Sequence, residues 1–397
     1  MFARSAFFAA IALTGSLGLV ALDPPNRPPV NALHREEPKK YDVSFSITLQ
    51  TVAHIADLAQ RGVFQFDEAP VVFPIIYMGQ YSRVFLNPEP YGRMLHDAAP
   101  VDARYMNMGV EENKPFNTHL LRMVSPRFRG IALKFTFQFQ TQTWNAQINE
   151  QAAQATKWPR DMKWPDEVLD GLKPQTMIES DNAIFREILQ RVYSTEAMAT
   201  MPPYMLAKGI VANVLNNFQV SGQGVTRGGV GEMRGLVMRG ALATVTNPDA
   251  MNRWVGSEHD LVCVCIALLR AANIPARAVI GAHEKLTSGG KTVPELISWA
   301  EFYLPDSGWV SFDPNAMRGN GSGRYQNMTA AWPDFGTMDE LNERVVLSYH
   351  FIPPAAVVVP GNYALWGWDP RPAQQPSYEQ AITIQITDRG RGEDDPR

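Results

Sequence analysis

Thiols are scarce in this chain. Only two of its 397 residues are cysteines, Cys263 and Cys265, and both lie inside the apolar run 261–269. Residues two positions apart on a helix point to different sides, which argues against a disulfide between them. A thiol in such a run behaves as a small hydrophobic side chain with a raised pKa. We therefore predict that both cysteines pack in a core, with a nucleophilic role for Cys263 as the open alternative.

Sequence signatures of metal and nucleotide sites are also missing. The seven histidines form no His-x-x-x-His pair, the cysteines form no Cys-x-x-Cys pair, and no Gly-x-x-x-x-Gly-Lys loop is present. Those spacings are the ones that hold zinc or surround phosphates. The sequence thus predicts no metal and no other cofactor. The formal net charge of −4 gives no electrostatic reason to expect nucleic acid binding.

The chain begins with an apolar stretch. One positive charge, Arg4, precedes residues 6–22, which carry no charge and end near small residues suited to cleavage. We expect residues 1–22 to be a signal peptide or, because the stretch is only slightly short of a bilayer span, a membrane anchor formed by residues 5–22. A signal peptide and a membrane anchor both predict an exported protein, located in the periplasm or at the extracellular face.

Alternating apolar and polar residues predict strands in the next part of the chain. Residues 43–49 and 133–141 place an apolar side chain at every second position, as half-buried strands do. The sequence therefore predicts an N-terminal β-sandwich. The segments expected around it are a proline-rich linker (23–40), the sandwich itself (41–145), a second linker (146–180), C-terminal strands (346–388) and a disordered charged tail (389–397).

The segment 256–314 carries the most specific pattern. It contains the turn Asn-Ile-Pro-Ala-Arg at 273–277 and the strand motifs Trp-Ala-Glu-Phe-Tyr-Leu-Pro at 299–305 and Gly-Trp-Val-Ser-Phe-Asp-Pro at 308–314. These motifs resemble the core of the transglutaminase-like superfamily, whose cysteine enzymes have a papain-like α+β fold. The resemblance implies such a core over 181–345, after the sandwich, and hence an α+β protein.

The resemblance also implies three catalytic positions, and this chain fills two of them differently. The family's usual interval of about nineteen residues before Arg277 leads back to Glu258 at the place of the nucleophilic cysteine. Ser298, directly before Trp299, takes the place of the histidine, while Asp313 keeps the aspartate. Acyl transfer needs a thiolate and an imidazole that carries the proton. We interpret Glu258, Ser298 and Asp313 as vestigial and predict no catalytic residue.

A helix is predicted to begin at Glu258 for a structural reason. Ser257 and Asp260 form the Ser-x-x-acid pattern of a capping box, and acidic residues are favoured in the first turn by the helix dipole. Helical periodicity over 183–189 and 204–215 predicts two further helices packed beside it.

Two places could recognise a partner. Tyr363, Trp366 and Trp368 form a candidate surface, because alternating aromatic residues of a strand share a face; core packing is the alternative. His283 follows the strand 278–281 and could approach the cleft from a neighbouring position, the alternative being a solvated loop histidine.

The resulting hypothesis is an exported, catalytically inactive transglutaminase-like protein. It would act as a scaffold or accessory subunit for another envelope protein or membrane protein complex. One alternative is an active thiol peptidase or transglutaminase in which Cys263 is a displaced nucleophile. The other is a module that binds cell-wall peptide or glycan in the vestigial cleft.

Overall fold

The structure is a computed structural model. It describes residues 31–52, 62–106, 109–113, 116, 118–221, 231–233, 236–286, 290, 292–319, 325–351 and 366–394. The predicted signal peptide or anchor, residues 5–22 included, lies outside these ranges. Asn31–Arg397 forms one compact unit. Across the described part of the chain, no helix is long and apolar enough to cross a membrane.

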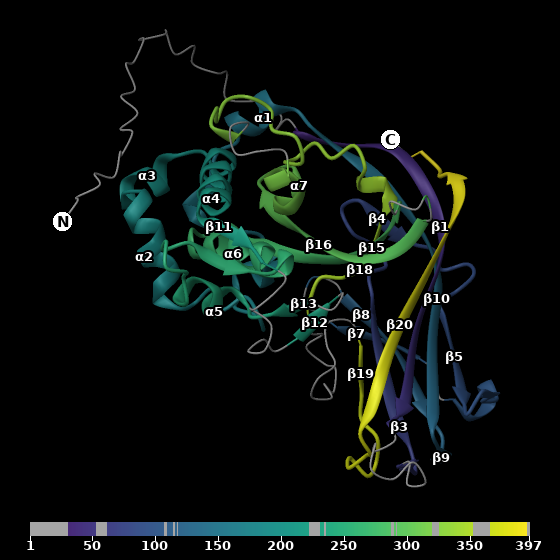
Figure 1. Ribbon diagram of the computed structural model, residues 1–397. Coiled ribbons are helices and arrows are strands. Elements are labelled where there is room, and N and C mark those ends of the chain that lie inside the picture. The colour runs from purple at the N-terminus through teal and green to yellow at the C-terminus, as the bar shows by residue number, and fades with distance from the viewer. Residues whose placement is uncertain are drawn as a thin grey trace, which may run out of the picture. The chain divides into compact units, whose positions relative to one another are not determined.

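Two antiparallel sheets form the first part of this unit (Figure 1). The larger sheet has the strand order β20-β1-β10-β5-β6, with β4 also paired to β10, and the smaller has the order β19-β3-β8-β7. The strands of these two sheets are β1 (Leu33–Thr51), β3 (Ala69–Ile75), β4 (Ser82–Val84), β5 (Tyr91–His96), β6 (Ala99–Pro100), β7 (Gly109–Asn113), β8 (Thr118–Ser125), β10 (Ala132–Ile148), β19 (Gly367–Trp368) and β20 (Tyr378–Arg391). A separate two-stranded sheet is formed by β2 (Phe64–Phe66) and β9 (Phe128–Gly130).

The period-two pattern buries one face of the larger sheet. The strands predicted at 43–49 and 133–141 are confirmed as parts of β1 and β10, which pair directly, with Phe45 opposite Phe137. Both phenylalanines are fully buried, and Phe73 of β3 stacks on Phe137 with ring centroids 4.6 Å apart. The apolar side chains of the two sheets thus meet in a common core, and the opposite face of β1 and β10 keeps polar side chains.

The C-terminal strands complete this sandwich. β20 pairs with β1 along most of its length, and β19 pairs with β3. They are therefore edge strands of the two N-terminal sheets, although the sequence had suggested a separate C-terminal segment. The strand expected just after residue 345 is β18 (Arg344–Ser348), which joins the sheet of the core.

Two segments expected to be irregular lie in strands. β1 begins at Leu33, inside the predicted linker 23–40, and β20 continues to Arg391, inside the predicted tail 389–397. Their proline and charged residues had predicted irregular, solvent-exposed segments. Pairing explains the difference, because β10 is long enough to extend opposite His34 and its neighbours, and β1 in turn reaches Arg391.

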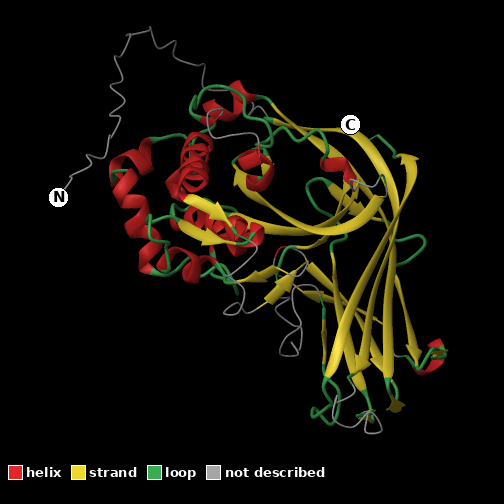
Figure 2. Ribbon diagram, viewed as in Figure 1, coloured by secondary structure: helices red, strands yellow, loops and turns green. Residues whose placement is uncertain are grey.

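The second part packs helices against a four-stranded sheet of order β17-β16-β15-β18 (Figure 2). Its helices are α1 (Glu150–Ala155), α2 (Ala183–Val192), α3 (Thr195–Thr200), α4 (Pro203–Asn217), α5 (Ala241–Thr246), α6 (Glu258–Ala271) and α7 (Pro314–Gly319), with 3-10 turns at Arg160–Met162, Asp166–Leu172 and Leu341–Glu343. A further 3-10 turn, Ala103–Tyr105, lies between β6 and β7 of the sandwich. Its strands are β11 (Phe218–Val220), β12 (Gly231–Met233), β13 (Leu236–Met238), β14 (Trp254–Gly256), β15 (Ala276–Leu286), β16 (Thr292–Leu304), β17 (Gly308–Phe312) and β18.

Helix α6 lies at the centre of this core. Every residue of 261–269 is fully buried, so the helix is apolar all round, as expected of a helix enclosed by other elements. It contacts β15 and β16 as well as α2, α4, α5 and α7. The predicted helices at 183–189 and 204–215 are confirmed as parts of α2 and α4, and both lie beside α6.

Candidate functional site

The amino end of α6 is held by a capping box. The Ser257 hydroxyl accepts the Asp260 N–H at 3.2 Å, and Asp260 Oδ2 accepts the Ser257 N–H at 2.9 Å. Asp260 Oδ1 also accepts N–H groups of Arg239 and Gly240, at 2.8 and 2.9 Å. Burial raises the pKa of Asp260 above its ordinary value, against the lowering effect of these donors. The predicted helix start at Glu258 is confirmed.

Glu258 is the first residue of α6 and remains partly exposed. Its backbone carbonyl accepts a hydrogen bond from Asn315 Nδ2 of α7 at 3.1 Å. A carboxylate at this position is favoured by the partial positive charge at the helix amino terminus. The residue is therefore both a suitable helix start and the most accessible of the three positions singled out from the sequence.

Ser298 contacts His259, the residue after Glu258, for which residual chemistry was the alternative to a purely structural helix start. Ser298 Oγ lies 2.8 Å from His259 Nδ1, and the two residues are only 4 % and 1 % exposed. His259 follows Glu258 in α6, whereas Ser298 lies on β16, so the pair joins helix to sheet. A serine beside an imidazole has the composition of a nucleophile with its base. Here, however, protein atoms enclose both side chains.

Asp313 is engaged in two structural roles. Its Oδ1 accepts the N–H groups of Asn315 and Ala316 at the start of α7, at 2.9 and 3.1 Å. Its Oδ2 lies 2.6 Å from Arg344 Nη1, and both side chains are nearly buried. The guanidinium of Arg344 also lies over the ring of Trp299, 5.6 Å from its centroid. Asp313 thus caps a helix and neutralises a nearly buried cation.

Both cysteines lie within the core of α6. Cys263 and Cys265 are fully buried and not disulfide bonded. Burial raises the pKa of both thiols, and that of Cys263 rises well above its ordinary range. The prediction of core packing is confirmed.

The two tryptophans proposed as a recognition surface are core residues. Trp366 and Trp368 are each 1 % exposed. Trp368 meets the rings of Phe64 and Phe66 edge-on at 6.0 and 6.2 Å, and Trp366 lies 6.1 Å from Phe135. The core-packing alternative therefore holds, because β19 pairs with β3 and brings both rings between the sheets. Tyr363 lies outside the described residues.

His283 is a strand residue of β15 and not a loop residue. It stands opposite Glu295 of β16, and its Nε2 lies 3.4 Å from Glu295 Oε2. Ser298, in contrast, stands opposite Ile280 on the same strand. Its hydrogen-bonding distance to Glu295 joins His283 to its neighbour in the ladder.

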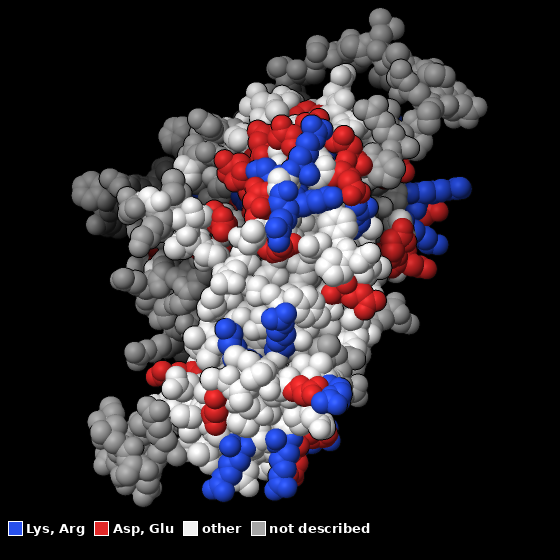
Figure 3. Space-filling view, turned by 90° about the vertical axis from the view of Figure 1, so that its right-hand side faces the viewer, with Lys and Arg blue, Asp and Glu red and all other residues white. Residues whose placement is uncertain are grey.

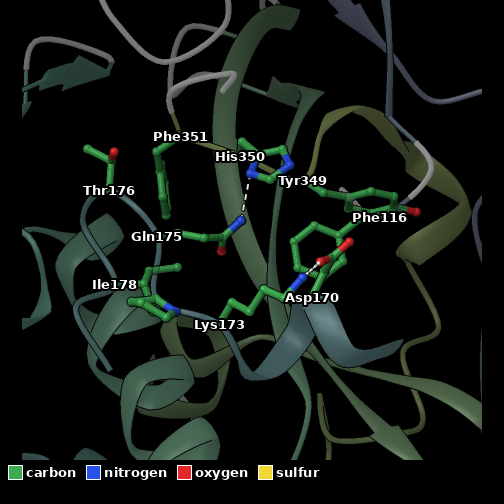
Figure 4. Close-up of a pocket in the computed structure, with 10 residues that line it drawn as sticks. Phe116, Asp170, Lys173, Gln175, Thr176, Ile178, Tyr349, His350 and Phe351 are labelled. Atoms are coloured by element: carbon green, nitrogen blue, oxygen red, sulfur yellow. Dashed lines mark hydrogen bonds and ion pairs between the residues drawn. The ribbon is translucent and has the colours of Figure 1, made fainter. Parts of the chain in front are cut away.

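The structure contains a cavity of about 430 Å³, which is drawn in Figure 4. It combines aromatic and polar walls, formed by Phe116, Asp170, Lys173, Pro174, Gln175, Thr176, Ile178, Tyr349, His350 and Phe351. Phe351 connects it to the amino end of α6, since its ring centroid lies 6.4 Å from that of His259.

Within the described ranges, no group of three His, Cys, Asp or Glu side chains could hold a metal ion.

The polar floor of this cavity is tied to α6 through Arg270. Its Nη2 donates to Gln175 Oε1 at 2.6 Å, and Gln175 Nε2 lies 2.6 Å from His350 Nδ1. Burial lowers the pKa of Arg270 to about 9. The guanidinium also donates to the backbone carbonyls of Lys173 and Ala276.

Comparison with known proteins identifies the core. The family model of the Transglutaminase-like superfamily matches residues 244–314, which include α6, β15, β16 and β17. These residues form a transglutaminase-like core. In fold, the chain is similar to a candidate cysteine protease from Cytophaga hutchinsonii, with a TM-score of 0.54, 13 % sequence identity, and coverage of 92 % of this chain and 95 % of that one.

A second solved structure, a candidate protease from Parabacteroides distasonis, matches at a TM-score of 0.22 and 12 % identity, over 69 % of this chain and 63 % of that one. A likeness that weak carries no structural argument. No curated protein matches the chain in sequence. The likeness to the first structure extends over sandwich and core together, and at this level of identity it is a likeness of fold.

Proposed function

We propose that this protein is an exported, non-catalytic member of the transglutaminase-like superfamily that binds another envelope protein as a scaffold or accessory subunit. The observation that carries the proposal is the absence of an accessible thiol at the amino end of α6. Glu258 occupies the first position of the helix, while Cys263 and Cys265 are fully buried. Export rests on the apolar stretch 5–22.

The other two positions support the same conclusion. An acyl-transfer site needs an imidazole that can accept a proton from the nucleophile and pass it to the leaving group. The imidazole of His259 lies near this site, but it is hydrogen-bonded to Ser298 and only 1 % exposed. Asp313 pairs with Arg344. Loss of a nucleophile or its base costs on the order of 10⁶ in turnover in a serine protease, which makes a binding role the better account of this site.

A displaced nucleophile at Cys263 requires a large opening of the core. The thiol is fully buried, and its pKa lies well above the ordinary range. The thiolate is the reactive form, so both properties oppose catalysis. Helix α6 would have to leave its contacts with β15 and β16 before substrate could reach the sulfur.

Ligand binding in the cavity is a second candidate function. The cavity holds aromatic faces from Phe116, Tyr349 and Phe351 and hydrogen-bonding groups from Lys173 and Gln175. Apolar walls with a few placed polar groups are typical of small-molecule and peptide sites. A short cell-wall peptide or glycan would meet these residues and not Ser298 or Asp313, which are only 4 % and 7 % exposed.

The experiment that tests the main proposal has two parts. The tagged full chain is isolated from gently solubilised envelopes, and the intact complex is weighed by native mass spectrometry. We expect one protein partner in a fixed ratio. In parallel, the purified chain is assayed for amidase and amine-incorporating activity beside Cys263→Ser. Turnover that disappears in Cys263→Ser would refute the non-catalytic hypothesis.

The absence of any co-purifying protein would refute the scaffold hypothesis. The cavity is then tested directly by equilibrium binding to isolated wall fragments, with Gln175→Ala as the altered form. Gln175 lines the cavity and connects Arg270 with His350. Binding that is equal in both forms would place the ligand elsewhere.

A further inference from the structure

One edge of the larger sheet is formed by a long strand whose middle carries no charge. β20 (Tyr378–Arg391) is the last strand in the order β20-β1-β10-β5-β6, and among the described residues it pairs only with β1. Residues 380–387 contain no charged residue, no proline and no glycine. Their sequence, Gln-Ala-Ile-Thr-Ile-Gln-Ile-Thr, is rich in β-branched residues and therefore well suited to a strand.

An edge strand of this kind can form backbone hydrogen bonds with a strand of another chain. Exposed edges offer a row of backbone N–H and C=O groups, and proteins usually protect them with lysine, proline, a bulge or a covering element. The irregularity in the pairing of β20 with β1 lies at its far end, between Lys39 and Tyr41. Figure 3 views the side of the molecule that carries the larger sheet, where charged side chains are densest at the upper end, sparse over the middle and present again at the lower end. Residues 380–387 contain no lysine or proline, and the pairing irregularity lies outside them.

Two strands of the core also lie near β20. The hairpin of β15 and β16 contacts it. Burial raises the pKa of Tyr41, and the charge of Glu284 in this hairpin adds to the shift. Because Tyr41 stands opposite Asp388, the hairpin lies near the Asp388 end of β20.

From these observations we propose that β20 is a dimer interface, at which it pairs antiparallel with β20 of a second copy of this chain and joins two sandwiches into one continuous sheet. The strand has the alternation that such a pairing needs. Ile384 and Ile386 point inward at 8 % exposure each, whereas Thr383, Gln385 and Thr387 are exposed. A partner strand must place apolar residues on the same side, and a second copy does so.

One register satisfies both faces of the joined sheet. With the two-fold axis at Ile384, Ile382 stands opposite Ile386 of the partner subunit, and Thr383 stands opposite Gln385 of the partner subunit. The same register sets Glu379 opposite Arg389 of the partner subunit, so opposite charges face each other twice by symmetry; within its own chain Arg389 also pairs with Asp42. Directly opposed side chains are the unit of sheet stabilisation, and opposite charges there are favourable. The contact is isologous, so it closes at two copies.

This inference goes beyond the proposed function and does not depend on it, because an active or an inactive core would carry the same edge.

The test uses exposed residues of β20 in the full chain. Thr383→Lys/Gln385→Lys and Thr383→Glu/Gln385→Glu each place like charges opposite one another across the two-fold axis. We expect each variant to dissociate at least about tenfold more readily than wild type, because like charges directly opposite are destabilising. Dissociation is measured by sedimentation in mild detergent, and circular dichroism verifies folding.

Mixing the variants separates pairing from general damage. The tagged Lys variant should capture the untagged Glu variant, since opposite charges then face each other across the axis. Thr383→Lys/Gln385→Glu should still dimerise, because in this register the introduced lysine of each copy faces the introduced glutamate of the other; an axis at Thr383 or Gln385 would oppose like charges instead. The matched control is Glu187→Gln/Gln190→Lys on exposed positions of α2, which makes the same change in net charge as the Lys variant and should leave dimerisation unchanged.

A monomeric wild-type chain would overturn the proposal. Dimers that persist unchanged in both like-charge variants would also overturn it, because association would then involve another surface.

Discussion

Asp313 Oδ2 and Arg344 Nη1 lie 2.6 Å apart, and this ion pair joins the start of α7 to β18. The two side chains are only 10 % and 12 % exposed. Breaking such a pair leaves one charge buried without its partner, which costs more than the pair itself contributes. The carboxylate that would orient a histidine in an active relative is thus a structural element of this core.

We predict that Asp313→Asn destabilises the protein by about 2 kcal/mol, the scale of a hydrogen bond to a charged group. Asparagine can still cap α7, so the loss reports mainly on Arg344. The free energy of unfolding is measured by urea titration. Asp394→Asn is the control, because it removes an ion pair to Arg391 whose side chains are both 76 % exposed, and such pairs contribute about 0–1 kcal/mol. Equal losses in the two variants would show that burial of the Asp313 pair has no effect.

The double variant Asp313→Asn/Arg344→Met removes both charges. We expect it to recover part of the lost stability, because no unpaired cation remains in the buried site. Measured together, the single variants and the double variant form a cycle that isolates the coupling between the two residues. A coupling energy near zero would contradict the assigned ion pair.

Trp368 gives a second prediction about stability. Trp368→Ala should lower the free energy of unfolding by about 3–5 kcal/mol, because it leaves a cavity among Phe64, Phe66 and Tyr378. Tyr105→Ala is the matched control at a position that is 68 % exposed, where substitutions change stability by about 0.5 kcal/mol or less. If Trp368→Ala were as stable as wild type but no longer bound a partner, the result would support the recognition surface suggested by the sequence.

The sequence was sufficient for the features that depend on local pattern. The capping box at Ser257 and Asp260, the apolar run 261–269 and the period-two segments of β1 and β10 each have a short-range signature, and the structure has all of them. The turn at 273–277 and the strand motifs after it indicated the transglutaminase-like core, which the family model matches over residues 244–314.

The features that depend on pairing between distant residues could not be predicted. Nothing near Tyr378 in the sequence indicates that β20 pairs with β1, which lies more than three hundred residues earlier. Trp366 and Trp368 have the same alternation whether their shared face is exposed or buried, and only the pairing of β19 with β3 decides between the two. The resemblance brought positions 258 and 298 together, but which side chain of α6 would meet Ser298 depended on the packing of α6 on β16, and it is that of His259.

His96 provides a pH-dependent prediction. Its Nε2 lies 2.8 Å from Ser125 Oγ, and its ring packs beside those of Phe128 and Phe66, with centroids 4.2 and 6.4 Å away. Burial lowers the pKa of His96 below 6.5, while the nearby Asp97 opposes the shift. Between the folded-state pKa and 6.5 the unfolded chain binds more protons than the native protein, so stability rises with pH in this window.

We therefore expect stability attributable to His96 to be full above pH 6.5 and to fall as the pH drops through the folded-state pKa. His96→Gln can retain the hydrogen bond to Ser125 but cannot titrate, and its unfolding free energy should lose this part of the pH dependence. His34→Gln, at an exposed position of β1, is the control. Parallel pH profiles of wild type and His96→Gln would contradict the prediction.

Glu258→Cys tests the amino end of α6 directly. Wild-type protein should show no thiol that reacts with a colorimetric disulfide reagent until it is unfolded, because both cysteines are fully buried. Glu258→Cys should add one reactive thiol in the native state, since position 258 is partly exposed and a helix amino terminus lowers the pKa of a thiol. The reaction should persist below the ordinary thiol pKa of about 8.5, and no amidase turnover should appear with it, because Ser298 cannot carry the proton. Rapid labelling of native wild-type protein would show that Cys263 or Cys265 becomes exposed. That result would support the alternative hypothesis of a displaced nucleophile.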